Sequence, residues 1–306
     1  MPTTPVPTAA DVSGATERAA PEWRMRGRTV VLDRPFILGV LNVTPDSFSD
    51  GGRFSSADEA VAFGVRLVEE GADGVDVGGE STRPQGARAV DAAEERCRVA
   101  PVVAALRARL PRTVISVDTV KAETAAAALD AGADAVNDVS GLRLDPALGH
   151  LIAERGAGAI LMHSRGGVSD MATFAHAAYG GDPAGDVVAE LQEAVGRARG
   201  AGIPDDAIVL DPGIGFAKRS EHSLALLAAL PRVAALGFPV LVGVSRKRFV
   251  GELSGVAEPA ARLHGTVGAN VAALARGARL FRVHDVRPHR EALDVAWAVL
   301  RRPEAR

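Results

Sequence analysis

The sequence has little of several residue types, and each scarcity excludes a class of protein. One cysteine, Cys97, stands among 306 residues, which rules out a disulfide within the chain and a zinc cluster built on cysteines. We therefore expect a reducing, cytoplasmic location. No apolar run is long enough to span a bilayer, and residues 2–22 lack the basic start and apolar centre of a secretory signal. The formal net charge of −3 gives no reason to expect binding to nucleic acid or to a membrane surface.

Short apolar runs alternate with helical segments along most of the chain. A Gly-Ala step ends several helical segments, as at Gly71-Ala72 and Gly132-Ala133, because glycine suits the left-handed residue after a helix. The runs are mostly apolar, as expected of parallel strands that are buried on both faces. Eight such runs are present, at residues 37–42, 74–77, 114–118, 135–138, 159–162, 208–211, 239–243 and 280–283.

Eight strand–helix units predict an α/β fold, a closed (β/α)₈ TIM barrel. The alternative is an open doubly wound sheet, which normally carries a glycine-rich phosphate loop after its first strand. Residues 42–45, Asn-Val-Thr-Pro, contain no glycine, which favours the barrel. We assign residues 27–300 to a single barrel domain. Residues 1–26, which are rich in Pro, Thr and Ala, are predicted to form a flexible tail, and residues 301–306 a C-terminal end.

Almost every predicted strand ends in a polar residue, and the C-terminal ends of barrel strands form the active site of this fold. The early and middle strands supply oxygen-bearing side chains, and the late strands supply cations. The first group comprises Asn42, Asp76, Asp118, Asn137 and Asp211, and the second comprises Arg246, Lys247, Arg282 and His284. This predicts a mouth with an acceptor-rich side and a cationic side, which suits a ligand that joins a donor-rich ring to a polyanion.

Three of the oxygen-bearing side chains are candidates to hold a flat ring. Asp118, Asn137 and Asp211 can each accept N–H groups from the edge of an amino-pyrimidine. A simpler interpretation stays open for the aspartates, since Asp76, Asp118 or Asp138 can cap the helix that follows its strand.

The cationic side chains are candidates to hold a diphosphate. Lys247, Arg282 and His284 supply the positive charge, and arginine can make bidentate contacts to phosphate. Asn42 offers a hard oxygen to a magnesium ion that keeps most of its waters. His163 also follows a strand, and a satisfied residue in the wall of the site is at least as good an interpretation as a direct role.

Two glycine-containing loops follow the first two strands and have the composition of mobile lids. The first contains Phe48 and Asp50, and the second contains Thr82 and Arg83. A third segment, Asp-Pro-Gly-Ile-Gly-Phe, ends at Phe216 and fits either a tight turn or a loop whose phenylalanine stacks on a flat ring.

Several of these segments together resemble the signatures of the dihydropteroate synthases. Ile-Leu-Gly-Val-Leu-Asn-Val-Thr-Pro-Asp-Ser-Phe-Ser-Asp-Gly-Gly at residues 37–52 resembles the first signature. Val-Asp-Val-Gly-Gly-Glu-Ser-Thr-Arg-Pro at residues 75–84 resembles the second. Shorter matches lie at residues 115–119, 137–141, 211–216, 245–247 and 282–285. The resemblance extends over residues 27–300, the whole of the predicted barrel.

The resemblance implies a transferase of folate biosynthesis and a target of sulfonamides. Such enzymes join (7,8-dihydropterin-6-yl)methyl diphosphate to 4-aminobenzoate and release 7,8-dihydropteroate and diphosphate, with Mg²⁺ as cofactor. It also implies a homodimer and a dissociative, SN1-like mechanism, in which the carbon–oxygen bond breaks before the arylamine attacks.

Carried over by motif, the resemblance gives roles to individual residues. Those implied to bind substrate are Thr82, Asp118, Asn137, Met162, Asp211, Phe216, Lys247, Arg282 and His284. Those implied to act in catalysis are Phe48, Asp50, Arg83, Asp118, Lys247, Arg282 and His284, and the magnesium residue is Asn42. One position departs from the pattern. Many relatives have a serine after the lysine that contacts the aminobenzoate carboxylate, whereas this chain has Arg248, a cation that can also hold a carboxylate.

Three other functions fit parts of this pattern. A methyltetrahydrofolate–corrinoid methyltransferase would share the barrel and the ring-holding residues, but it would need neither the late cations nor the Asn42 loop. A lyase that uses Lys247 as a Schiff base would need other signs of carbonyl chemistry, and the sequence has none. A catalytically silent pterin-binding copy would be expected to lose a loop motif, and each motif is present here.

Overall fold

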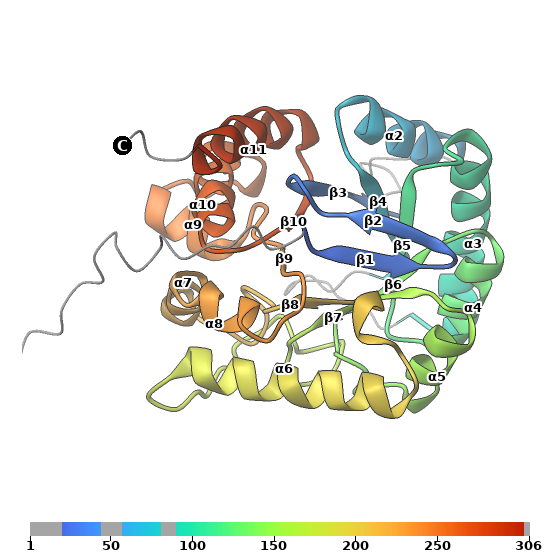
Figure 1. Cartoon of the computed structure of the whole chain (residues 1–306), viewed down its shortest axis with the longest axis horizontal. Helices are drawn as coiled ribbons and strands as arrows, with labels where there is room; N and C mark the ends of the chain where they lie inside the picture. The colour runs from blue at the N-terminus through green and yellow to red at the C-terminus, as the bar shows by residue number, and fades with distance from the viewer. Residues whose placement is uncertain (1–19, 44–56, 81–89, 303–306) are drawn as a thin grey trace, which may run out of the picture.

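The computed structural model describes residues 20–43, 57–80 and 90–302, and its central feature is a parallel barrel (Figure 1). The strands are β3 (Phe36–Asn42), β4 (Gly74–Gly78), β5 (Val114–Asp118), β6 (Ala135–Asp138), β7 (Gly158–Met162), β8 (Ile208–Asp211), β9 (Leu241–Val242) and β10 (Leu280–Val283). They follow the order β8-β7-β6-β5-β4-β3-β10-β9, and a single bridge between Leu210 and Val240 joins its two ends. The predicted (β/α)₈ barrel is confirmed, and each strand end lies within two residues of its predicted place.

Helices cover the outside of the barrel. They are α2 (Ala57–Glu69), α3 (Ala92–Arg109), α4 (Ala122–Asp130), α5 (Pro146–Glu154), α6 (Pro183–Gly200), α7 (Ser220–Ala228), α8 (Leu230–Ala234), α9 (Arg248–Ser254), α10 (Leu263–Ala275) and α11 (Val286–Leu300), with the short 3₁₀ turns η2 (Asp205–Ala207) and η3 (Pro259–Ala261). Asp91, Asp145 and Asp182 begin α3, α5 and α6, where their side chains accept backbone N–H groups of the first turn. In the part of the chain that the structure describes, no helix could cross a membrane.

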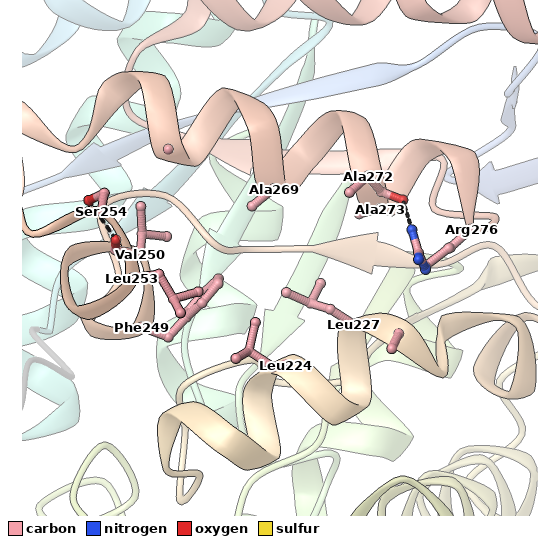
Figure 2. Close-up of a pocket in the computed structure, with 12 residues that line it drawn as sticks. Leu224, Leu227, Phe249, Val250, Leu253, Ser254, Ala269, Ala272, Ala273 and Arg276 are labelled. Carbon is pink, nitrogen blue, oxygen red and sulfur yellow. Dashed lines mark hydrogen bonds between the residues drawn. The ribbon is translucent and has the colours of Figure 1, made fainter.

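An apolar groove of about 440 Å³ lies on the outer surface between α7, α9 and α10. Figure 2 shows Leu224 and Leu227 of α7 opposite Phe249 and Leu253 of α9, with Ala269 of α10 above them. The Leu253 side chain is 65% exposed, which is unusual for a large apolar residue beside other apolar residues.

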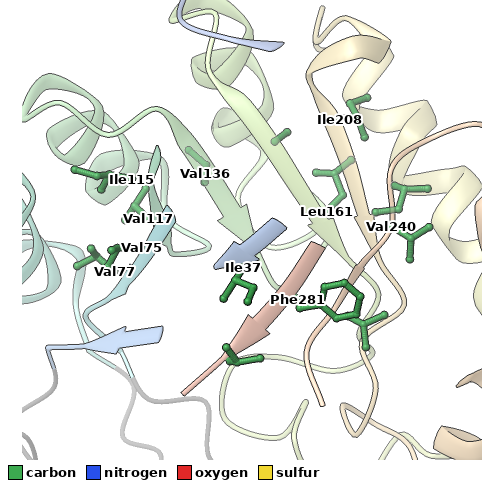
Figure 3. Close-up of a cluster of buried hydrophobic side chains, with 14 of the residues drawn as sticks. Ile37, Val75, Val77, Ile115, Val117, Val136, Leu161, Ile208, Val240 and Phe281 are labelled. Carbon is green, nitrogen blue, oxygen red and sulfur yellow. The ribbon is translucent and has the colours of Figure 1, made fainter. Parts of the chain in front are cut away.

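The main hydrophobic core fills the layer between strands and helices. Figure 3 shows its strand side, with Val75 on β4, Ile115 on β5 and Phe281 on β10. Alternate strand residues point the other way, so that Ile160 and Val209 belong to a second cluster inside the barrel. Successive strand residues are therefore buried on both faces, which explains why the strands read as continuous apolar runs.

An antiparallel hairpin packs against the barrel strands at the start of the described chain (Figure 1). It consists of β1 (Glu22–Met25) and β2 (Arg28–Val31), joined by Arg26 and Gly27, which both have positive φ angles of 43° and 79°. Trp23 is fully buried in the inner cluster, and its Nε1 donates to the Ala207 carbonyl at 3.0 Å. The hairpin closes the N-terminal end of the barrel.

The hairpin also changes the predicted domain boundary. We expected a flexible tail over residues 1–26, but ordered structure is already present in β1, where Trp23 and Met25 are buried. Two alternating apolar residues next to a Pro-, Thr- and Ala-rich segment are too short a pattern to indicate a strand. The burial comes from contact with the distant β7, β8 and η2 rather than from a local preference.

Candidate active site

A fully buried carboxylate, that of Asp76, lies at the centre of the residues that the barrel brings together. Ser116, its register partner on β5, donates its hydroxyl to Asp76 Oδ1. Asn137 Nδ2 donates to Asp76 Oδ2 at 3.0 Å, and Arg282 Nε donates to the same oxygen. Arg282 Nη2 donates to Asp118 Oδ2 at 2.7 Å. Four strands, β4, β5, β6 and β10, therefore meet in one hydrogen-bonded group.

Arg282 does not lie on a separate cationic side, so the predicted division of the mouth is wrong for this residue. It reaches across the barrel from β10 to carboxylates on β4 and β5. Burial raises the pKa of Asp118 to about 7, although Arg282 acts to lower it and Asp76 adds to the rise. Burial alone would lower the pKa of Arg282, but the Asp76 and Asp118 carboxylates raise it above its ordinary value.

Asp211 and Lys247 form a second part of the site, beside β8 and β9. The Gly213 N–H donates to Asp211 Oδ1 at 2.7 Å, and burial raises the pKa of Asp211. Lys247 Nζ donates to the Ile214 carbonyl and lies 4.5 Å from the centre of the Phe216 ring. Burial lowers the pKa of Lys247 to about 8, against the opposing effect of Asp211. A Cβ on Gly243 would lie 3.8 Å from both Asp211 Oδ2 and Arg282 Cβ, so the two parts adjoin.

An apolar wall accompanies these polar groups. Met162 packs with Val120, Val139 and Met171, and Phe216 lies against the same cluster. The wall combines the flat Phe216 ring with the flexible side chains of Met162 and Met171, which suits contact with the face of a planar ring. Met162 and Phe216, both implied by motif to line the site, are thus close to one another.

The close approach of two loops explains the glycine at position 213. Its φ angle is +66°, and a Cβ there would lie 1.9 Å from the His163 carbonyl oxygen. Lys218, which is buried, donates to the carbonyls of Gly213 and Phe216 at 3.0 Å each and lies 2.8 Å from His163 Nδ1. Residues 211–216 therefore form a turn that the buried Lys218 stabilises by binding its backbone carbonyls. The sequence pattern did not predict this role for Lys218.

His163 is a satisfied wall residue, as the simpler interpretation held. Its Nε2 lies 3.0 Å from Glu190 Oε2, and its Nδ1 faces Lys218. Burial, followed by the nearby Lys218, lowers the pKa of His163 to about 4. The imidazole is therefore neutral at pH 7, with its Nδ1 free to accept from the lysine.

The aspartates predicted as possible helix caps behave differently from one another. Asp138 accepts the backbone N–H groups of Ser140 and Leu142, so it holds its own loop in shape. Asp76 and Asp118 instead face Arg282, and α4 begins at Lys121 without a side-chain cap. None of the three therefore caps the helix that follows its strand, and Asp145 caps α5, the helix after β6.

The remaining late cations have partners of their own. Arg246 forms a bidentate ion pair with Asp285 and is held away from the central group. The guanidinium carbon of Arg248 lies 4.1 Å from the centre of the Phe174 ring. His284 Nδ1 lies 2.9 Å from Ser245 Oγ, which connects the ends of β10 and β9.

Asn42 ends β3 at the rim of the mouth. A Cβ on the neighbouring Gly78 would lie 3.6 Å from Asn42 Oδ1 and 3.5 Å from Asp118 Cβ, so the amide is next to the central group. Within residues 20–43, 57–80 and 90–302, no cluster of three or more His, Cys, Asp or Glu side chains could hold a metal ion. A cation here would need its other ligands from water or substrate, which is how magnesium commonly binds beside phosphates.

The four loop residues expected in the site, Phe48, Asp50, Thr82 and Arg83, lie outside the described residues. The flanks of the second loop are described. Glu80 Oε1 accepts the Val90 N–H at 2.7 Å, and Lys121 Nζ donates to Glu80 and Glu95 at 2.9 and 2.7 Å. These contacts, which the sequence did not indicate, bring the two flanks of the loop together.

Comparison with known proteins connects this geometry to one group of enzymes. Residues 38–284 match the family model described as "Pterin binding enzyme". The dihydropteroate synthase of Mycobacterium leprae is 47% identical over 273 residues, which cover 86% of this chain and 93% of the relative. A structure of Xanthomonas albilineans dihydropteroate synthase with 4-aminobenzoic acid has a TM-score of 0.84 and 45% identity, covering 92% and 100% of the two chains. The same enzyme in complex with 7,8-dihydropteroate has a TM-score of 0.81 and 42% identity, with the same coverage.

Proposed function

We propose, because the chain belongs to the dihydropteroate synthase family, that it transfers the (7,8-dihydropterin-6-yl)methyl group from its diphosphate to 4-aminobenzoate. The products would be 7,8-dihydropteroate and diphosphate. The observation that carries the proposal is the acceptor-rich group of Asp118, Asn137 and Asp211 at one barrel mouth, with Arg282 and Lys247 beside it. The related enzymes with bound 4-aminobenzoic acid and 7,8-dihydropteroate support the same substrates.

In this proposal the ring lies between polar edges and an apolar wall. The Asp118 and Asp211 carboxylates accept N–H groups of the pterin, and the Asn137 amide binds the same edge. Met162 and Phe216 contact the faces of the ring, and the Lys247 ammonium holds Phe216 in place from 4.5 Å.

We assign a dissociative mechanism to the transfer. The carbon–oxygen bond breaks first, the bonding electron pair leaves with diphosphate, and the amine of 4-aminobenzoate then attacks the methylene cation and loses a proton. Asp118 and Asp211 stabilise the electron-poor ring, while Arg282, Lys247 and His284 stabilise the departing charge. No protein nucleophile takes part. Lys247, which donates to the Ile214 carbonyl, acts as a cation, and this placement disfavours a Schiff-base lyase.

Magnesium would be held by Asn42 together with diphosphate oxygens and water. The single amide oxygen at the rim fits such a site, because Mg²⁺ keeps several waters and takes few protein ligands beside phosphates. When bound, the ion would neutralise charge on the diphosphate. We further assign Phe48, Asp50, Thr82 and Arg83 to the site from their motifs, and Arg248 to the 4-aminobenzoate carboxylate in place of a serine.

A homodimer is also part of the proposal. The groove between α7, α9 and α10 supports it, because the exposed Leu253 and Leu224 form an apolar surface of the kind that protein interfaces cover (Figure 2).

A methyltetrahydrofolate–corrinoid methyltransferase is a weaker proposal, because it would not use the cations beside the ring site.

The test is diphosphate release by the purified chain with Mg²⁺ and the pterin diphosphate, with and without 4-aminobenzoate. We expect release together with dihydropteroate, detected by mass spectrometry. Lys247→Ala and Asp211→Ala should each weaken binding of the pterin diphosphate roughly 10- to 100-fold, as expected for loss of a charged hydrogen bond. Binding of the pterin without product would indicate a catalytically silent copy, and unchanged affinity in both variants would contradict the assigned site.

A further inference from the structure

Asp76 accepts three side-chain hydrogen bonds at the centre of the site, yet nothing in its surroundings requires it to touch a substrate. Both carboxylate oxygens are occupied, Oδ1 by the Ser116 hydroxyl and Oδ2 by Asn137 and Arg282. Its side chain is fully buried in the strand β4. A buried carboxylate in such a place needs partners that compensate its charge, and here those partners include Asn137 of the proposed ring site and Arg282 beside it.

The carboxylate can only accept hydrogen bonds, and this settles which end of the Asn137 amide faces it. At 3.0 Å from Asp76 Oδ2 the amide must present its nitrogen, because an oxygen there would meet a second acceptor. The Asn137 carbonyl oxygen is therefore turned away from Asp76. An amide without such a partner could adopt either orientation.

We propose that Asp76 is the positioning residue that gives the ring site its selectivity for a hydrogen-bond donor edge. It turns the Asn137 carbonyl oxygen toward the ligand, so that Asn137 joins Asp118 and Asp211 as a third acceptor. The inference rests on the proposed function for the identity of the ring. A ring with an amino group at that edge can then donate to these three acceptors. A ring with a carbonyl there places its own acceptor against those of the protein and loses the hydrogen bonds.

The same carboxylate fixes the direction of Arg282. With Nε on Asp76 and Nη2 on Asp118, the guanidinium plane is held at two points. Asp118 is thus kept in place through Arg282, although Asp76 does not contact it. Asp76 consequently orients two of the three ring-binding side chains, Asn137 directly and Asp118 through Arg282, without contacting the ring itself.

The test exchanges the donor and the acceptor between the two positions. Asn137→Asp places two carboxylates against each other. The double variant Asp76→Asn with Asn137→Asp restores one donor and one acceptor between these two positions with the original net charge, although Arg282 Nε loses its acceptor because it shared Asp76 Oδ2 with Asn137. The probes are 6-hydroxymethylpterin and 6-hydroxymethyllumazine, in which an oxo group replaces the amino group. Dissociation constants are measured by calorimetry, and thermal unfolding confirms that each variant is folded.

We expect the wild-type chain to prefer the pterin roughly 100-fold or more. Asn137→Asp should lose most of that preference, and the double variant should regain roughly tenfold or more of it. The control is Asp134→Asn, which removes another buried aspartate, paired with Arg107 at the start of β6, and should lower stability while leaving the pterin preference unchanged.

Two results would overturn the inference while the proposed function stands. One is wild-type pterin affinity in Asn137→Asp. The other is a double variant whose preference for the pterin over the lumazine is no greater than that of Asn137→Asp, although both are folded. Failure of the wild-type chain to bind either ring would overturn the proposed function and this inference together.

Discussion

Two residues of the site have pKa values that burial has moved toward neutrality from opposite directions. Burial raises the pKa of Asp118 to about 7 and lowers that of Lys247 to about 8. Between these values the carboxylate and the ammonium are both charged, which is the state that binds a donor-rich ring and an anion. Because the folded state holds the Asp118 proton more tightly than the unfolded state, this group costs stability as the pH rises toward 7. The site therefore uses a charge that the fold disfavours.

A bell-shaped pH dependence follows from these two residues. Affinity for the pterin diphosphate should be greatest between about pH 7 and 8, since Asp118 gains a proton below this window and Lys247 loses one above it. Asp118→Asn should flatten the acid limb, and Lys247→Arg should flatten the alkaline limb. Calorimetric titration at several pH values measures both limbs, with 6-hydroxymethylpterin as a control ligand that lacks titrating phosphates. If the acid limb persists in Asp118→Asn, a group other than Asp118 causes the loss of affinity at low pH.

At the scale of single elements, the hairpin β1–β2 contributes stability without contributing to the site. Trp23 fills the N-terminal end of the barrel. Its ring packs edge-on against the Phe36 ring, with 6.3 Å between the ring centroids, and also contacts Gly158. A Cβ on Gly158 would lie 2.9 Å from the Trp23 ring nitrogen, which explains the glycine at the start of β7. The binding residues lie at the other ends of the strands, so the two functions are separated along the barrel axis.

Truncation of this tryptophan should therefore separate stability from binding. We expect Trp23→Ala to lower the free energy of unfolding by about 3–5 kcal/mol, from the lost apolar burial and the lost hydrogen bond to Ala207. Trp23→Phe should cost less, because much of the ring remains. Urea unfolding followed by circular dichroism gives the change, and the affinity for pterin diphosphate at low temperature should stay at the wild-type value. A matching loss of affinity would show that the hairpin acts on the distant mouth.

At the scale of the whole molecule, the apolar groove between α7, α9 and α10 is the surface that a second copy is proposed to cover. Leu253→Arg places a charge in that groove and should convert the dimer to a monomer, as measured by sedimentation or light scattering. The matched control is Val31→Arg on the hairpin strand β2, where an exposed apolar residue lies away from the outer helices and the dimer should persist. A wild-type chain that is monomeric at micromolar concentration would contradict the proposal.

The sequence could predict the barrel because each barrel strand is buried on both faces and several helices are followed by a glycine turn, as at Gly71 and Gly132. It could also predict which strand ends bring polar side chains to one mouth of the barrel, as Asp118, Asn137 and Asp211 show. It could not predict partners across the barrel. Arg282 and Asp76 are 206 residues apart, and only barrel closure brings them together. The same holds for Lys218, whose burial depends on two loops meeting at Gly213.

Barrel closure has a consequence for the ligand. Strand β9 has two residues and meets β8 through the lone bridge from Leu210 to Val240, so this junction has the fewest paired residues in the wall. Asp211 and Lys247 stand on either side of this seam. A ring bound by both residues would link β8 to the segment after β9. Binding would therefore increase the free energy of unfolding of the barrel. The bound substrate would then act as a structural link between two weakly paired strands of the wall, in addition to being the molecule that reacts.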